Sequence, residues 1–229
     1  MAELSPLLAA RWSPYAFDPS VELTEAEAAS LLEAARWAPS AGNRQPWRFL
    51  LGRRADEAYK RIFVHLAAGN QRWAGRASAL LLGAYLVPTP GGPAPADHHP
   101  VRGADDPGQV QAAHHPVRGA DDPGQVQAAH HPVRGADDPG QAAYDLGQAV
   151  AHLTVQAGTL GLHVHQMAGF DRAGIAIDLA LPDDVRPHVV VAVGRLGDPR
   201  SLPGDLRRRE TELRRRRPVT DLILGPPTG

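Results

Sequence analysis

One stretch of the sequence decides the fold, and it reads Ala38-Pro39-Ser40-Ala41-Gly42-Asn43-Arg44-Gln45-Pro46-Trp47. Its two prolines stiffen the backbone, and its glycine permits dihedral angles that other residues rarely adopt. The amides of Asn43 and Gln45 each offer hydrogen-bond donors and acceptors. This rigid polar loop lies between a helical pattern and an apolar run, and it is suited to contact a small ligand while Trp47 packs into the core.

The segment before the loop has the pattern of an amphipathic helix. Thr24 and Glu27 have the spacing of a capping box, and apolar residues follow at helical intervals until Pro39 ends the pattern. Similar patterns in the rest of the chain predict helices over 4–12, 55–68, 143–161 and 172–181. Apolar runs predict strands over 47–51, 78–87, 162–166 and 188–193. Near the C-terminus we expect a helix or extended arm over 206–217 and an edge strand over 219–224. Helices that alternate with buried strands indicate an α/β or α+β layered domain.

Composition restricts the function classes. The chain has 229 residues, a formal net charge of −1 and no cysteine. The charge balance argues against a nucleic-acid or membrane partner, and the lack of cysteine excludes disulfides, thiolate catalysis and cysteine-ligated metals. No apolar run reaches the roughly 20 residues of a membrane helix, and the N-terminus lacks the pattern of a signal peptide. We therefore expect a cytoplasmic protein.

Residues 88–141 differ in composition from the rest and contain a tandem repeat. The 16-residue unit HHPVRGADDPGQVQAA begins at His98, is repeated at His114 and begins again at His130, from which it runs to Gln141. The unit has few apolar residues to bury, which predicts a disordered surface insertion within a single domain that spans 1–229. Its histidine pairs leave open a metal-binding or interaction role for the repeat.

Two further motifs flank the loop, Arg11-Trp12-Ser13 upstream and the segment from Gly161 to Phe170 downstream. In this order the three motifs resemble those of the FMN-dependent nitroreductase family. The resemblance covers roughly residues 4–87 and 142–224 and breaks at the repeat. It implies an α+β, nitroreductase-like fold, in which helices flank a central, mostly antiparallel sheet, and a homodimer with two FMN sites at its interface.

The resemblance assigns the first motif to FMN. Arg11, Trp12 and Ser13 match an Arg-x-Ser motif that contacts the phosphate, ribityl chain or pyrimidine edge of the flavin. The planar fork of an arginine suits phosphate and carbonyl oxygens. Many relatives carry another basic residue two positions after the serine, where this chain has Tyr15. Taken alone, the triplet would indicate only an ordinary exposed arginine.

The resemblance assigns the loop and the downstream motif to the same cofactor. The implied contacts in the loop, often made by the partner subunit, are Pro39, Ser40, Asn43 and Gln45. Those in the downstream motif, made by the backbone, are Gln166, Met167, Ala168 and Gly169. His163 and His165 share a face of the predicted strand, but no third metal ligand is evident, so we expect no metal site.

A run of arginines near the C-terminus completes the implied site. Relatives often place one or two basic residues before a similar proline-containing stretch, and these bind the FMN phosphate. The residues that match best here are Arg216 and Arg217, just before Pro218. A solvated charged face remains an alternative, as does a nucleic-acid patch, although Glu210 and Glu212 dilute its charge.

The implied reaction proceeds in two stages. NAD(P)H reduces FMN and leaves, and a nitroaromatic, quinone or related small-molecule acceptor then takes the electrons. The cofactor carries this chemistry, so we assign no catalytic side chain. The sequence lacks a Gly-x-Gly-x-x-Gly fingerprint, so the nicotinamide donor must visit the flavin site itself. Three alternatives stay open: a flavin-binding or storage protein without NAD(P)H turnover, a metal-binding or interaction protein acting through the repeat, and a different reaction on the same fold.

Overall fold

The computed structural model describes residues 3–87 and 138–225 of the chain. Within these ranges the central element is a four-stranded sheet in the order β1-β2-β4-β3, with every neighbouring pair antiparallel. The strands are β1 (Trp47–Arg53), β2 (Ala79–Leu86), β3 (His163–Met167) and β4 (Val185–Gly194). The predicted central, mostly antiparallel sheet is therefore confirmed. Nearly all of the predicted repeat lies outside the described residues.

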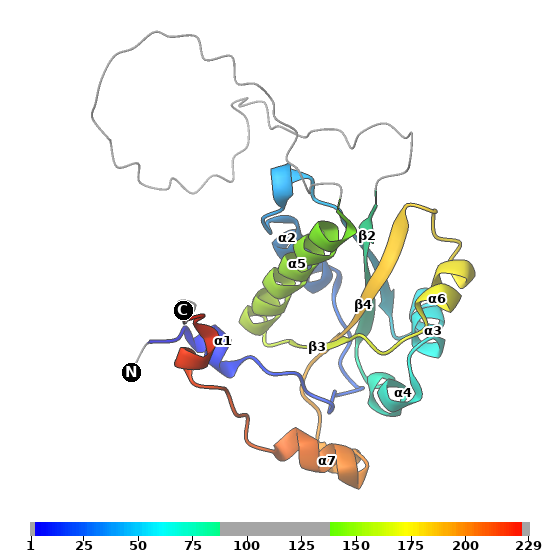
Figure 1. Cartoon of the computed structure of the whole chain (residues 1–229). Coiled ribbons are helices and arrows are strands. Elements are labelled where there is room, and N and C mark those ends of the chain that lie inside the picture. The colour runs from blue at the N-terminus through cyan, green and yellow to red at the C-terminus, as the bar shows by residue number, and fades with distance from the viewer. Residues whose placement is uncertain (1–2, 88–137, 226–229) are drawn as a thin grey trace.

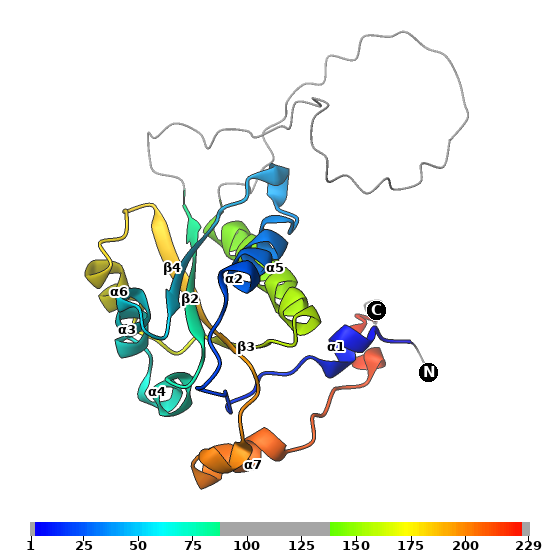
Figure 2. The same ribbon diagram turned by 180° about the vertical axis from the view of Figure 1, so that it is seen from behind.

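Helices cover both faces of the sheet, as Figures 1 and 2 show from opposite sides. The helices on one face are α2 (Glu25–Arg36) and α5 (Pro139–Thr159), and those on the other are α3 (Glu57–Val64), α4 (Ala68–Ala74) and α6 (Arg172–Asp178). Successive residues of β2 alternate between the two layers, because Leu80 packs with one buried cluster and Leu81 with the other. The near-continuous apolar run in β2 follows from this burial on both faces.

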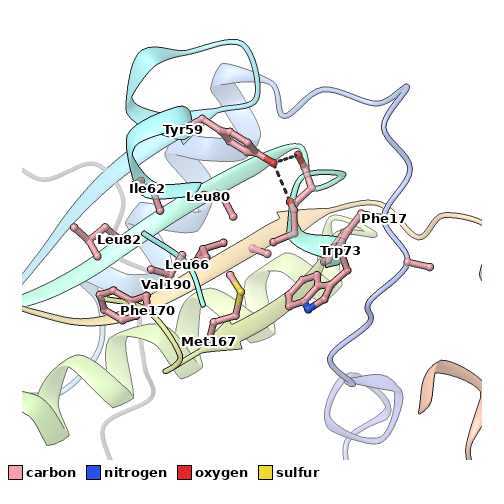
Figure 3. Packing of buried hydrophobic residues seen from close by; sticks show 14 of the residues in the cluster. Phe17, Tyr59, Ile62, Leu66, Trp73, Leu80, Leu82, Met167, Phe170 and Val190 are labelled. Atoms are coloured by element: carbon pink, nitrogen blue, oxygen red, sulfur yellow. Dashed lines mark hydrogen bonds between the residues drawn. The ribbon is translucent and has the colours of Figure 1, made fainter. Parts of the chain in front are cut away.

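Figure 3 shows the cluster on the α3 and α4 side. The rings of Trp73 and Phe17 stack at a centroid distance of 6.1 Å. Met167, the last residue of β3, and Phe170, in the loop that follows, belong to the same cluster. The buried hydroxyl of Tyr59 donates to the carbonyl oxygens of Ala74 and Ala77. The ring therefore adds buried apolar surface to the core and leaves no buried hydroxyl without a hydrogen-bond partner.

The ends of the long helices follow the sequence signals. The Oγ1 atom of Thr24 accepts from the backbone N–H of Glu27 at 3.2 Å, and the Glu27 carboxylate accepts from the backbone N–H of Thr24 at 2.9 Å. The predicted capping box is thus confirmed. Gly161 has φ +68°, as expected of a residue that ends α5. At its other end α5 begins at Pro139, where Asp138 caps it, so residues 139–141 of the last repeat copy form its first turn.

Several predicted elements differ from the structure in extent or type, and the charged segment combines its two predicted forms, a helix and an extended arm. The first helix is only α1 (Pro6–Ala10), and the predicted helix over 55–68 ends at Val64, after which a separate α4 forms. A β-bridge between Leu66 and Phe170 interrupts the helical path there. The charged segment is helical only in α7 (Gly204–Thr211). The predicted edge strand over 219–224 is a 3-10 turn, η3 (Val219–Leu222), because the arm leads away from the sheet toward α1 (Figure 1).

We expect Gly52→Ala to destabilise the fold strongly. A Cβ on Gly52 would lie 2.3 Å from the backbone nitrogen of Tyr59, so β1 and α3 would have to separate. Overpacking of this kind costs about 1–3 kcal/mol or more of unfolding free energy. Gly69→Ala is the matched control, because no atom lies within 4 Å of its Cβ position. The urea concentration at the unfolding midpoint is compared for the two variants. Equal midpoints would contradict the close packing of β1 against α3 at Gly52.

Candidate functional site

The first predicted motif lies where the segment after α1 meets the C-terminal arm, which comprises α7 and residues 212–225. Arg11 faces a hollow of about 320 Å³ between these two parts of the chain. The residues that line the hollow are Arg11, Trp12, Ser13, Tyr15, Arg209, Glu210, Glu212, Arg214 and Arg216. The structure therefore brings the first motif together with Arg216, which lies about two hundred residues later in the sequence.

Two sets of hydrogen bonds hold the two ends of the chain together at this hollow. The carboxylate of Glu210, on α7, is 6% exposed and accepts from the backbone N–H groups of Tyr15 at 2.7 Å and Ala16 at 3.2 Å. The guanidinium of Arg214 donates to the carbonyl oxygens of Arg11 at 2.5 Å and Ala9 at 3.2 Å. These bonds fix the backbone on both sides of the arginine cluster.

The hollow carries an excess of positive charge. Burial lowers the pKa of Arg11, and the nearby charges of Arg216 and Arg214 lower it further. Among the described residues, no carboxylate forms an ion pair with any of these three arginines. Guanidinium groups that repel one another around an open space are suited to bind an anion such as a phosphate, which would relieve the repulsion.

The position of the C-terminal arginines refines the prediction from sequence. Arg216 lines the hollow, whereas Arg217 is exposed and lies outside it. Arg214 and Arg209 line the hollow as well, and the sequence reasoning did not select them. Within an unbroken run of four arginines the sequence holds no signal that separates those that face the hollow from those that face solvent.

The loop with the second motif lies elsewhere, at the end of α5 that is far from α1 (Figure 1). It forms the short helix η1 (Ala41–Asn43), and the backbone N–H of Ala41 donates to the buried carboxylate of Asp145 at 3.2 Å. The Oγ atom of Ser40 accepts from the backbone N–H of Gln45 at 3.0 Å, and the carbonyl of Pro39 accepts from Gln148. No residue of this loop lines the arginine hollow, so one chain does not assemble all the predicted contacts.

The left-handed backbone of this loop supports the sequence interpretation of a rigid turn. Gly42 has φ +58°, and Asn43 and Gln45 also have positive φ values of 55° and 49°. Non-glycine residues in this region are uncommon and concentrate at functional loops. Trp47 is buried, as predicted for the first residue of the strand.

The third motif ends β3 and crosses to α6. Met167 directs its side chain into the core, whereas Ala168 and Gly169 are exposed. The carbonyl of Gly169 accepts from the side-chain amide of Asn70 at 2.9 Å. A Cβ on Gly169 would lie 3.2 Å from that amide, so the segment is closely packed against α4. Asn70 thus borders the motif, and no sequence pattern singled it out.

The two histidines of β3 lie against the segment that follows Arg11. His165 bonds through Nδ1 to the carbonyl of Pro14 at 2.8 Å, and its ring packs on Tyr15 and Trp73. Burial lowers the pKa of His165 and of His163, so both rings are neutral at pH 7. In the described part of the chain no group of three metal-ligating side chains is present, and no helix is long and apolar enough to cross a membrane.

Comparison with known proteins gives a consistent result. The model of the family described as "Nitroreductase family" matches residues 8–195. A solved structure described as an oxidoreductase containing FMN is 30% identical to this chain and superposes with a TM-score of 0.73. The match covers 100% of this chain and 94% of the chain in that structure. A nitroreductase-type protein from Exiguobacterium sibiricum, solved in complex with FMN, is 18% identical, covers 99% and 98% of the two chains and has a TM-score of 0.67.

One curated relative matches only in part. An uncharacterized 15.4 kDa protein from Mycolicibacterium smegmatis is 53% identical over 57 residues. The match spans 25% of this chain and 38% of the relative.

Glu210→Gln is expected to lower the free energy of unfolding by about 1–3 kcal/mol, because the N–H groups of Tyr15 and Ala16 donate to different carboxylate oxygens and the glutamine would place an NH2 donor against one of them. Glu212→Gln removes the same charge from the same hollow, but Glu212 is exposed, so its effect should stay within about 0.5 kcal/mol. Urea unfolding followed by tryptophan fluorescence compares the two. Equal losses of unfolding free energy in the two variants would show that the charge determines the stability, and not the hydrogen bonds from Tyr15 and Ala16 to Glu210.

Proposed function

Because the match over residues 8–195 shows that the chain belongs to the nitroreductase family, we propose that it is an FMN-dependent oxidoreductase. The proposed reaction takes a hydride from NAD(P)H and passes the electrons to a nitroaromatic, a quinone or a related small acceptor. The observation that carries the proposal is the hollow lined by Arg11, Arg214 and Arg216, with which no carboxylate of the described residues forms an ion pair. The presence of FMN in solved relatives, one of them 30% identical, supports the choice of cofactor.

The arginine hollow fits the phosphate of FMN. A phosphate needs several fixed donors and compensating positive charge, and an arginine fork supplies both. Glu210 and the backbone bonds of Arg214 keep the cluster in place before the ligand arrives. Ser13 adds a hydroxyl beside Arg11, which it contacts at 3.3 Å. We propose Arg214 and Arg216 as the C-terminal phosphate ligands, with Arg217 in solvent.

The segment from Gln166 to Gly169 is proposed to lie beside the flavin ring and to bond it through its backbone. Ala168 and Gly169 are exposed and carry little side chain, so a planar ring can approach the main chain closely. Asn70 orients this segment through its bond to the Gly169 carbonyl. FMN, when bound, supplies the hydride-transfer chemistry, and the protein contributes binding, orientation and exclusion of water.

We further propose a homodimer in which the loop with Pro39, Ser40, Asn43 and Gln45 contacts the cofactor of the partner subunit. The separation of this loop from the arginine hollow within one chain favours such sharing. Large apolar side chains are also exposed in α1, just before it and in the C-terminal arm, namely Leu4, Leu7, Leu8, Leu213, Val219, Leu222, Ile223 and Leu224. Patches of this kind mark association surfaces. Dependence on NAD(P)H is consistent with the expected cytoplasmic location.

The proposed cofactor is tested by the visible absorption spectrum before and after anaerobic addition of NADPH or NADH. We expect a flavin spectrum that bleaches, whereas a flavin that does not bleach with either donor would indicate a storage protein. Arg216→Gln should weaken FMN binding by about 10- to 100-fold, since it removes a charged hydrogen bond. Arg217→Gln is the matched control and should change the FMN dissociation constant less than about twofold. Equal effects would contradict the phosphate assignment.

Sharing of the site between subunits is tested by complementation. Arg216→Gln and Ser40→Tyr should each lower FMN occupancy when present in both subunits. If a site combines Arg216 of one subunit with Ser40 of the other, random mixing should restore about a quarter of the sites, because half of the dimers are mixed and each has one intact site. If the dimers are shown to exchange subunits and mixing still restores no FMN occupancy, the whole site lies within one chain.

A further inference from the structure

Within residues 3–87 and 138–225, no strand pairs with the outer edge of β4 over residues 185–189. β3 pairs with β4 only from His163 opposite Gly194 to Met167 opposite Val190. Residues 185–189 of β4 extend beyond this pairing, and the chain after Met167 turns away toward α6. The exposed edge of a strand presents unpaired backbone groups, which need partners from side chains, water or a ligand.

A bulge lies in this open part of β4. On the β2 side, Gly83 pairs with Val189 and Ala84 pairs with Pro187, so His188 is the extra residue that has no partner. Bulges redirect side chains and occur often beside functional sites. The His188 ring lies edge-on to Tyr85 at a centroid distance of 5.6 Å.

Arg172, at the start of α6, is fixed against the same edge. Its Nη2 atom donates to the carbonyl oxygen of His188 at 3.2 Å, and its guanidinium carbon lies 5.0 Å from the centre of the Phe170 ring. Among the described residues no carboxylate pairs with Arg172. The side chain is therefore oriented by a ring and a backbone carbonyl, and several of its five N–H donors stay available.

Two adjoining hollows share Arg172 and His188. The larger is a groove of about 580 Å³ lined by Tyr85, Arg172, Ala173, Ala176, Val185, Arg186, Pro187 and His188. The smaller, of about 180 Å³, has an apolar floor of Leu146, Val150 and Val189 and also contains Gln166 and Ala168. Among the described residues that line the two hollows there is no aspartate or glutamate, although the whole chain has a net charge of −1.

The electrostatics of the groove centre on Arg172. Burial lowers the pKa of His188, and the charge of Arg172 lowers it further, so the imidazole is neutral at pH 7. Arg186 also lines the groove, but its Nη1 atom is engaged by the carbonyl oxygens of Asp183 and Val185. Arg172 lines both hollows, whereas Arg186 lines only the groove, so Arg172 is the charge placed to meet an anion whose ring lies in the smaller hollow, with a neutral imidazole beside it.

We propose that Arg172 and His188 form a subsite for the carboxylate of an aromatic acceptor. This inference rests on the proposed function, because Gln166 and Ala168 belong to the segment that is proposed to border the flavin. A ligand whose carboxylate is held by Arg172 would place its ring over the apolar floor of the smaller hollow, next to that segment. An apolar hollow with one oriented cation is the usual arrangement for an amphipathic small molecule. The preferred acceptors are therefore anionic aromatic compounds.

The test compares 4-nitrobenzoate with 4-nitrobenzamide, a neutral compound of similar shape with the same nitro group. For the FMN-loaded protein we expect kcat/KM to be higher for 4-nitrobenzoate. Arg172→Gln should lower kcat/KM for 4-nitrobenzoate by about 10- to 100-fold, which corresponds to the loss of a charged hydrogen bond. For 4-nitrobenzamide the change should stay within about twofold. Arg172→Lys should recover part of the loss, because it restores charge without the fork.

Arg200→Gln is the matched control, since Arg200 is exposed outside both hollows and its loss changes the net charge equally. FMN content and the thermal midpoint verify that each variant is folded and loaded. A parallel loss for both compounds, no loss for either, or a change confined to KM for NAD(P)H would overturn the proposal.

Calorimetric binding of 4-nitrobenzoate to the purified protein separates this proposal from the proposed function. Binding that depends on Arg172, in a protein that oxidises no NAD(P)H, would support the carboxylate subsite and reject the redox role. NAD(P)H oxidation with neutral acceptors but no binding of 4-nitrobenzoate would support the redox role and reject the carboxylate subsite.

Discussion

The buried carboxylate of Glu210 is the interaction on which the candidate site depends. It joins α7 to the backbone of Tyr15 and Ala16, and so fixes the distance between Arg11 on one side and Arg214 and Arg216 on the other. The same helix also contributes to the core, because Leu206 of α7 is buried in the cluster that contains Tyr59 and Trp73. Glu210 acts together with the bonds of Arg214 to the carbonyls of Arg11 and Ala9, and with the ion pair between Arg72 of α4 and Asp205 of α7.

The sheet and its helices were largely predictable because their signals are local. The capping box of Thr24 and Glu27 and the apolar run of β2 each indicate one structure without reference to distant residues. Elements that depend on tertiary contacts were not predictable. The break between α3 and α4 follows from the bridge of Leu66 to Phe170, and the turn over 219–222 follows from the path of the arm.

The candidate site divides in the same way. Arg11 and Arg216, which the sequence motifs select, line one hollow although they are far apart in the chain. The motifs do not reveal that the loop around Ser40 lies at the other end of α5, nor that Arg214 and not Arg217 faces the hollow. Asn70, Arg172 and His188 lie outside every motif, and their positions are set by the turn after β3 and by the bulge in β4.

An anion in the arginine hollow would act on the fold as well as on function. The pKa of Arg11 is lowered partly by Arg216 and Arg214, which means that the like charges oppose the docking of the arm that Glu210 secures. A bound phosphate reverses the sign of this contribution, because it attracts all three guanidinium groups at once. A ligand that binds only the folded form stabilises it in proportion to the logarithm of its concentration over its dissociation constant. On the proposed assignment of this hollow to the FMN phosphate, cofactor binding and docking of the arm form one coupled equilibrium, in which the like charges that oppose docking in the free protein favour the bound anion.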